Sequence, residues 1–163
     1  AYRIAVTNDA RYPFNSFSQL LKKANMVVGT NIMGLSMGRF IASFVGIKVA
    51  LADNLIPGIT NGTIASDGSI SAESIDVGML QNYLFSYFLR SPENVITTYP
   101  YLGSAMQSGV YKTASGRNLK YSDKGNTISV QLDDRQEVNV TSSYDYFPFA
   151  YNDGGFHLIE AIL

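Results

Sequence analysis

The chain has 163 residues, of which 46% are hydrophobic and 15% are charged, and its formal net charge is −1. The charged fraction lies well below the roughly 25% of an average soluble domain, which predicts uncovered apolar surface that a partner normally buries. The near balance of 12 basic and 13 acidic residues disfavours nucleic-acid binding through a basic patch, and the absence of cysteine excludes disulfides and thiolate chemistry.

The N-terminal part predicts an edge strand or arm followed by a helix. Residues 2–6 alternate between apolar and other side chains, and turn-prone residues follow them. Asn15 or Ser16 can cap a helix over about 16–28, because a short side-chain oxygen satisfies free amides of the first turn. The apolar face of this helix would consist of Phe17, Leu20, Leu21 and Ala24.

The most apolar stretch predicts a second helix over about 32–52. Small residues recur there at a spacing of four: Gly34, Gly38, Ala42, Gly46 and Ala50. Residues four apart lie one above another on a helix, so this small-residue ladder predicts a seam where a second backbone can approach closely. Such a helix would be apolar nearly all round, which is typical of a helix surrounded by neighbours.

Two alternatives stay open for this part of the chain. Glycines and β-branched residues over 44–51 also suit a strand, since each internal glycine costs an isolated helix ~1 kcal/mol relative to alanine. The region 24–57 could contact a membrane, but Arg39 and Lys48 interrupt it. Its longest uncharged run, 24–38, is shorter than the ~20 residues that a spanning helix needs, so membrane contact is the less favoured alternative.

The middle of the chain predicts a loop and a third helix over about 72–90. The loop over 53–67 carries favoured turn dipeptides at Pro57-Gly58, Asn61-Gly62 and Asp67-Gly68. Ser71 is expected to cap the helix, with Glu73 and Asp76 in its first turn, where the helix dipole favours negative charge. Tyr83 and Tyr87 belong to its apolar stripe.

From residue 95 onward the apolar period changes to the alternation of half-buried strands. We predict strands near 94–100, 109–114, 118–122, 127–132, 137–142 and 156–162, separated by turn clusters in the spacing of an antiparallel meander. The fold class is therefore α+β, with N-terminal helices followed by a meander of five to six strands. We expect a single domain, made of a helical arm (1–57), a loop with the third helix (58–92) and the sheet (93–163).

Candidate chemistry is sparse. His157 is the only histidine, so a Ser-His-Asp device would have to use it with Asp153, but no serine lies in a nucleophile-elbow pattern. One histidine without cysteine does not make a zinc site, and no glycine-rich phosphate-binding motif is present. Asp133 and Asp134 with Glu137 fit a hairpin turn better than an acid–base pair. We therefore predict no catalytic residue, no cofactor and no metal.

The leading functional prediction is a non-enzymatic structural or assembly subunit, such as a virion, tail or secretion-apparatus component. The partner would be a second copy or another assembly protein, without nucleic acid, and the setting an assembled particle rather than the free cytoplasm. The predicted interface comprises the small-residue ladder together with Tyr83 and Tyr87, since tyrosine suits interfaces. Two alternatives are a membrane-active protein that inserts region 24–57 and a small enzyme with a site around His157.

Overall fold

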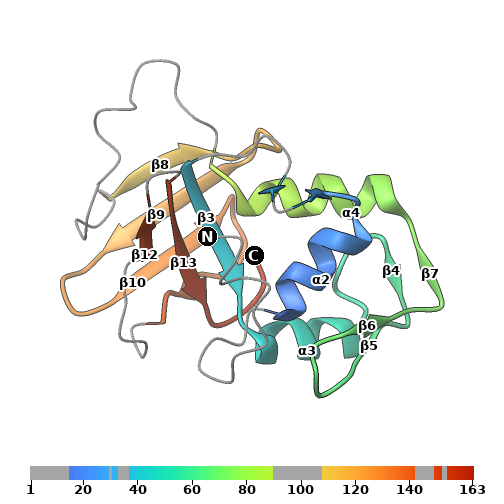
Figure 1. The fold of residues 1–163 in the computed structure, drawn as a ribbon. Helices are drawn as coiled ribbons and strands as arrows, with labels where there is room; N and C mark the ends of the chain where they lie inside the picture. The colour runs from blue at the N-terminus through green and yellow to red at the C-terminus, as the bar shows by residue number, and fades with distance from the viewer. Residues whose placement is uncertain (1–14, 30, 33–36, 90–107, 142–148, 152–153) are drawn as a thin grey trace.

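The computed structural model describes residues 15–29, 31–32, 37–89, 108–141, 149–151 and 154–163 (Figure 1). The fold is mixed α+β, as predicted, with the helices gathered on one side of the molecule and the larger sheets on the other. The helices are α2 (Asn15–Lys23), α3 (Phe44–Ala52), α4 (Val77–Leu84) and the 3₁₀ helix η1 (Phe85–Tyr87). No helix among the described residues combines the length and the apolar character that crossing a bilayer requires.

The larger sheet is a four-stranded antiparallel meander in the order β11-β10-β9-β8. Its strands are β8 (Gly109–Lys112), β9 (Asn118–Asp123), β10 (Ile128–Leu132) and β11 (Val138–Asn139). The alternating pattern places Leu119, Tyr121, Val130 and Leu132 in the core, where their side chains have no exposed area. The predicted meander is thus confirmed over 108–141, while the strand predicted near 94–100 lies outside the described residues.

The second large sheet contains β12 (Phe149–Tyr151), β13 (Gly154–Ile159) and β3 (Met37–Ala42) in the order β12-β13-β3. β13 runs parallel to β3, with His157 opposite Phe40. An isolated bridge between Val140 and Ile159 joins this sheet to the end of the meander. The prediction of one meander of five to six strands therefore fits only roughly, because the strand near 156–162 belongs mainly to this second sheet.

The prediction of one continuous helix over 32–52 is wrong. Residues 37–42 form β3, and the chain becomes helical only at Phe44, after Ser43 caps α3 by accepting a hydrogen bond from the Gly46 amide. The helix expected within 44–51 is confirmed. Gly38 and Ala42 consequently lie on a strand and Gly46 and Ala50 on a helix, while Gly34 lies outside the described residues. The small-residue ladder does not form a single seam.

The physical reason is the pairing of β3. Phe40, Ile41 and Ala42 are at most 2% exposed, so β3 is buried on both faces, as is typical of parallel strands. A strand that is buried on both faces is apolar at successive positions, so its sequence does not alternate. Without this alternation, the sequence pattern does not distinguish the strand from a buried helix. Local spacing therefore indicated a helix where long-range pairing with β13 forms a strand.

The first and third helices are shorter than predicted. α2 ends at Lys23, and Asn25 adopts a φ of 55°, after which β1 (Val27–Val28) and β2 (Asn31–Ile32) form a ribbon. α4 begins at Val77 and is capped by Asp76, whose carboxylate accepts a hydrogen bond from the Met79 amide at 2.9 Å. Ser71 does not cap it, because residues 59–75 form two short ribbons.

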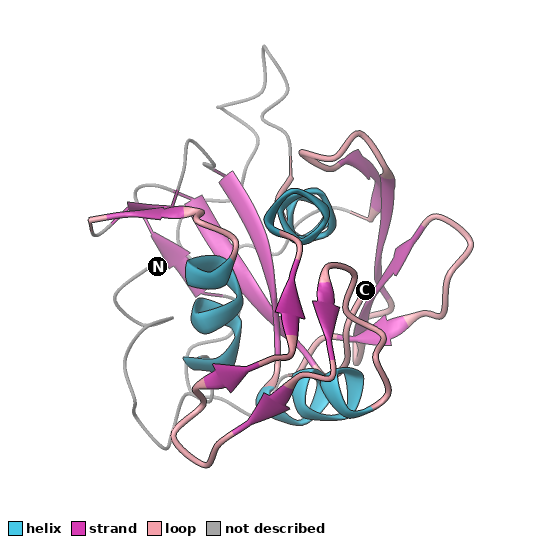
Figure 2. Ribbon diagram, turned by 90° about the vertical axis from the view of Figure 1, so that its right-hand side faces the viewer, coloured by secondary structure: helices cyan, strands magenta, loops and turns pink. Residues whose placement is uncertain are grey.

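These ribbons lie between α4 and α3 (Figure 2). One pairs β4 (Ile59–Thr60) with β7 (Ser74–Ile75), and the other pairs β5 (Thr63–Ile64) with β6 (Ile70–Ser71). Ile59 and Ile70 point one buried side chain from each ribbon into the core. The core thus extends continuously from the sheets to the helical side of the molecule.

Candidate functional site: a groove beside α3

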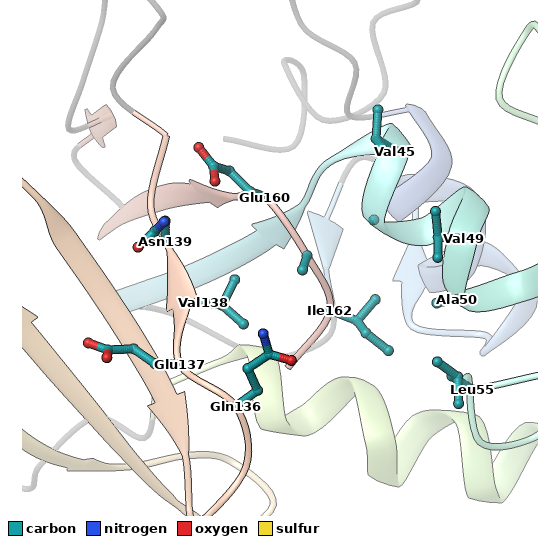
Figure 3. Close-up of a pocket in the computed structure, with 12 residues that line it drawn as sticks. Val45, Val49, Ala50, Leu55, Gln136, Glu137, Val138, Asn139, Glu160 and Ile162 are labelled. Carbon is teal, nitrogen blue, oxygen red and sulfur yellow. The ribbon is translucent and has the colours of Figure 1, made fainter. Parts of the chain in front are cut away.

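A pocket of about 470 Å³ lies between α3 and the end of the four-stranded sheet (Figure 3). We call this pocket the groove. It is lined by α3 with Leu55 on one side, by residues 136–139 on the other, and by the chain segment 160–162 between them. Three segments that are far apart in the sequence therefore build it.

One side of the groove is an apolar wall formed by Val45, Val49 and Leu55, whose side chains are 65%, 53% and 56% exposed. The opposite face of α3 carries the buried Ile47 and Leu51, and Lys48 is the single polar side chain of this helix. A surface helix of a soluble domain normally has a polar outer face. Exposed apolar side chains gathered in this way are typical of a surface that a partner covers.

The segment 160–162 packs directly against the backbone of α3. A Cβ atom added to Gly46 would lie 2.8 Å from the Cα atom of Ala161, so only glycine permits this approach. The hydroxyl of Ser43 donates to the carbonyl of Glu160 at 3.2 Å and fixes the start of the segment. The close backbone approach that the small-residue ladder predicted for another chain thus occurs at Gly46, within this chain.

The sheet side of the groove is polar. Glu137 accepts hydrogen bonds from the Ser129 hydroxyl and from the Lys124 ammonium, the latter at 3.1 Å. These two contacts, that of Ser129 first, lower the pKa of Glu137 below its ordinary value. Glu160 is exposed and forms no ion pair with another residue in the described part of the chain. The groove therefore offers one uncompensated negative charge opposite an apolar wall.

His157 lies outside the groove, in a closed aromatic centre. Its ring stacks on Phe40 with centroids 5.4 Å apart and meets the edge of Tyr121 at 5.5 Å. The Tyr121 hydroxyl lies 3.4 Å from Nε2. The residue is 3% exposed, and burial lowers the pKa of His157 to about 4, so the imidazole is neutral at pH 7. Asp153, its expected catalytic partner, lies outside the described residues.

Tyr83 and Tyr87 are buried, at 5% and 1% exposure, and this corrects the prediction that they form an interface. Their hydroxyls lie 2.7 Å apart, and the amide of Leu163 donates to the Tyr87 hydroxyl at 2.9 Å. Burial raises the pKa of Tyr83 to about 12 and that of Tyr87 well above its ordinary value. Both side chains serve the core and hold segment 160–163 in place.

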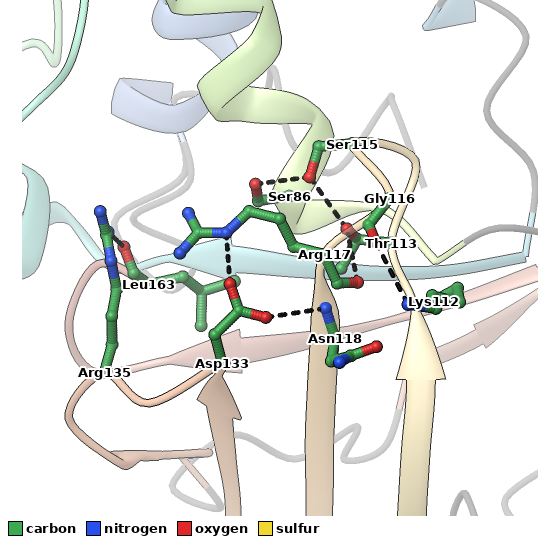
Figure 4. A network of polar contacts seen from close by, with 10 residues as sticks. All are labelled: Ser86, Lys112, Thr113, Ser115, Gly116, Arg117, Asn118, Asp133, Arg135 and Leu163. Atoms are coloured by element: carbon green, nitrogen blue, oxygen red, sulfur yellow. Dashed lines mark hydrogen bonds and ion pairs between the residues drawn. The ribbon is translucent and has the colours of Figure 1, made fainter.

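A polar network joins the sheet to the end of α4 and η1 (Figure 4). Ser115 lies 2.9 Å from the hydroxyls of both Ser86 and Thr113, and Arg117 donates to Asp133 at 2.7 Å. Hydrogen bonding to Arg117 lowers the pKa of Asp133, which occupies the hairpin turn that the sequence predicted. Asp133 thus links the β9–β10 region through its contacts with Arg117 and the Asn118 amide.

The described residues contain no group of three or more side chains placed to hold a metal ion. The sequence missed the groove because its lining residues are ordinary valines, a leucine and short polar side chains. The available signal was that residues 44–52 carry a single polar side chain, Lys48. No protein-family model matches the chain, and no curated protein is similar to it in sequence.

Proposed function

We propose that this protein is a non-enzymatic subunit of a larger assembly and that the groove is its contact with a second copy of the chain. The observation that carries the proposal is the apolar wall, in which three large side chains more than half exposed lie side by side along a pocket. Covering such a wall removes apolar area from water at roughly 25 cal/mol per Å². A net charge of −1 opposes the approach of a second copy only weakly.

The closed centre around His157 also supports an assembly role over catalysis. A general base must reach a substrate proton, and the single histidine of the chain is enclosed between Phe40 and Tyr121. The enzyme alternative would need a site built on other residues. The membrane alternative relied on region 24–57 as one apolar unit, whereas its described parts divide among ribbon, strand and helix.

The test is sedimentation velocity of the purified chain over a wide micromolar range. We expect concentration-dependent association, and we expect Val45→Glu to weaken it at least tenfold, because a charge would be buried against the partner. Val28→Glu is the matched control, since Val28 is 66% exposed on β1 and lies outside the groove. A wild-type chain that stays monomeric throughout, or equal effects of the two variants, would contradict the proposal.

A further inference from the structure

A stripe of small and aliphatic side chains runs along the solvent side of α3. This stripe consists of Val45, Val49 and Ala52, and all three are exposed. Their spacing of four and then three residues keeps them on one side of the helix, because 3.6 residues complete a turn. The buried positions of α3 lie on the opposite side. The stripe is therefore open along its whole length to an approaching helix.

Charged residues of opposite sign border the stripe on its two margins. Since one residue turns a helix by about 100°, Lys48 lies on one margin and Asp53, the C-cap of α3, lies on the other. The groove opens on the margin of Asp53, where Glu160 adds a second carboxylate. All three residues are exposed, and none of them forms an ion pair with another described residue. The exposed face of α3 thus has one basic and one acidic margin.

This pattern is typical of a parallel pair of helices. In such a pair an apolar seam repeats after four and three residues, and a charged residue on one margin contacts the opposite margin of the second helix five positions further on. Lys48 and Asp53 are five positions apart. In an antiparallel pair equal margins would meet, so lysine would face lysine and the carboxylates would face one another. The charges therefore favour the parallel orientation.

We propose that α3 pairs in parallel with α3 of a second copy about a two-fold axis, so that Lys48 of each copy lies against the acidic margin of the other. This inference rests on the proposed assembly function and names the contacting segment and its orientation. The stripe packs against its own counterpart. The aliphatic stem of Lys48 covers the mouth of the groove, while its ammonium reaches the carboxylates of Asp53 and Glu160.

The contact uses the same patch on both copies, so it is isologous and closes at two copies. A larger assembly would consequently be built from dimers, with other surfaces joining one dimer to the next. This follows from the direction of the two-fold axis, which runs along the pair of helices and leaves neither stripe open after one contact.

Cysteine cross-linking tests the contact, because the chain contains no cysteine of its own. In the parallel pair every position of the stripe faces its own counterpart, with Cα atoms within the roughly 7 Å that a disulfide spans. Val45→Cys and Val49→Cys should therefore each give a disulfide-linked dimer as the main product of mild oxidation. Val28→Cys is the matched control, since Val28 is 66% exposed and lies on β1, and it should stay largely monomeric.

The same approach distinguishes the two orientations. In an antiparallel pair, Val45 of one copy would face Ala52 of the other. A mixture of Val45→Cys and Ala52→Cys would then cross-link, whereas Val45→Cys alone would not. This outcome would overturn the parallel arrangement while leaving the assembly role intact. The substituted side chains are exposed, so the variants should fold like the wild type, and circular dichroism checks this.

A charge exchange tests the pairing of the margins. Lys48→Glu and Asp53→Lys should each weaken association severalfold in sedimentation velocity, and the double variant should recover most of the loss. Lys23→Glu is the matched control, because it makes the same charge change at an exposed position of α2. Recovery in the double variant is a result that a general effect of net charge does not produce.

The outcomes separate the two proposals. If the chain associates and Val45→Glu weakens association, but the stripe variants do not cross-link and the charge exchange gives no recovery, the helix-pairing inference is overturned while the assembly role stands. If the chain never associates, the assembly role falls and this inference falls with it. Cross-linking at both valines together with recovery by charge exchange supports the inference.

Discussion

The centre around His157 and the groove beside α3 differ in which side chains they expose to solvent. In the centre, His157 is 3% exposed and Tyr121 has no exposed area, and burial keeps the histidine neutral. In the groove, the exposed side chains of the α3 wall are aliphatic and carry no reactive group. The imidazole of the centre is thus closed to solvent, whereas the apolar wall of the groove is open to it. This difference is one reason why we propose an assembly role.

The largest expected effect comes from protonating the closed centre. Burial lowers the pKa of His157 in the folded chain to about 4, below its ordinary value of 6.5. Between these values the unfolded chain binds a proton that the folded chain does not. Stability from this group is therefore complete above pH 6.5 and decreases as the pH falls, by roughly 3 kcal/mol at pH 4.

Urea unfolding of the wild type and of His157→Gln between pH 7 and pH 4 measures this contribution. The variant should lose stability more gently with falling pH, because glutamine does not titrate. The lowered pKa values of Asp133 and Glu137 act equally in both proteins and cancel in the comparison. Parallel pH profiles for the two proteins would show that solvent reaches the centre.

The groove depends on close packing in one place, between Gly46 and segment 160–162. Gly46→Ala places a Cβ 2.8 Å from the Ala161 Cα atom, so helix and segment must separate, at a cost of about 2 kcal/mol. Gly78 in α4 is the matched control. A Cβ at Gly78 meets its nearest neighbour, the Asp76 carboxylate, at an ordinary 3.6 Å, and helix propensity should add up to ~1 kcal/mol of stability.

Thermal and urea unfolding of both alanine variants checks this contrast. Destabilisation by Gly46→Ala with stabilisation by Gly78→Ala would show that the groove has a rigid base. Equal changes in the free energy of unfolding of the two variants would mean that segment 160–162 moves away from α3 at little cost. The groove would then be flexible and not preformed.

The sequence predicted the meander well because its strands are neighbours along the chain and half-buried. The alternation of Ile128, Val130 and Leu132 and the turn residues between strands contain most of the information needed for this pairing. β3 is different, because its partner β13 begins more than 100 residues later and pairs in parallel. No local period identifies such a partner, and the glycines at 38 and 46 therefore indicated one helix.

The groove was beyond sequence reasoning for a related reason. Val45 and Glu137 come together through long-range contacts. The bridge between Val140 and Ile159 joins the end of the meander to β13, and β13 leads directly into the segment that packs on Gly46. The sequence did indicate that residues 44–52 carry a single polar side chain, Lys48. It did not indicate which elements surround α3 or that one side of the helix stays open to solvent.

A smaller effect is expected where the core holds the end of segment 160–163. Tyr87→Phe removes the oxygen that accepts the Leu163 amide and also leaves the Tyr83 hydroxyl without this contact. Losing a buried hydrogen bond of this kind costs about 1.5 kcal/mol. Urea unfolding measures the cost, and faster exchange of the Leu163 amide would locate it. An unchanged Leu163 exchange rate would show that Arg135, which donates to the Leu163 carbonyl, holds the segment alone.

The smallest effect is expected at the polar side of the groove. Lys124 and Glu137 pair at 3.1 Å with side chains 59% and 46% exposed, so water screens their attraction, and Lys124→Ala should leave thermal stability unchanged. The pKa of Glu137 should nevertheless rise in an NMR titration, while staying below its ordinary value because the Ser129 hydroxyl still donates to it. An unchanged pKa of Glu137 in Lys124→Ala would instead mean that the hydrogen bond from Ser129 alone sets it.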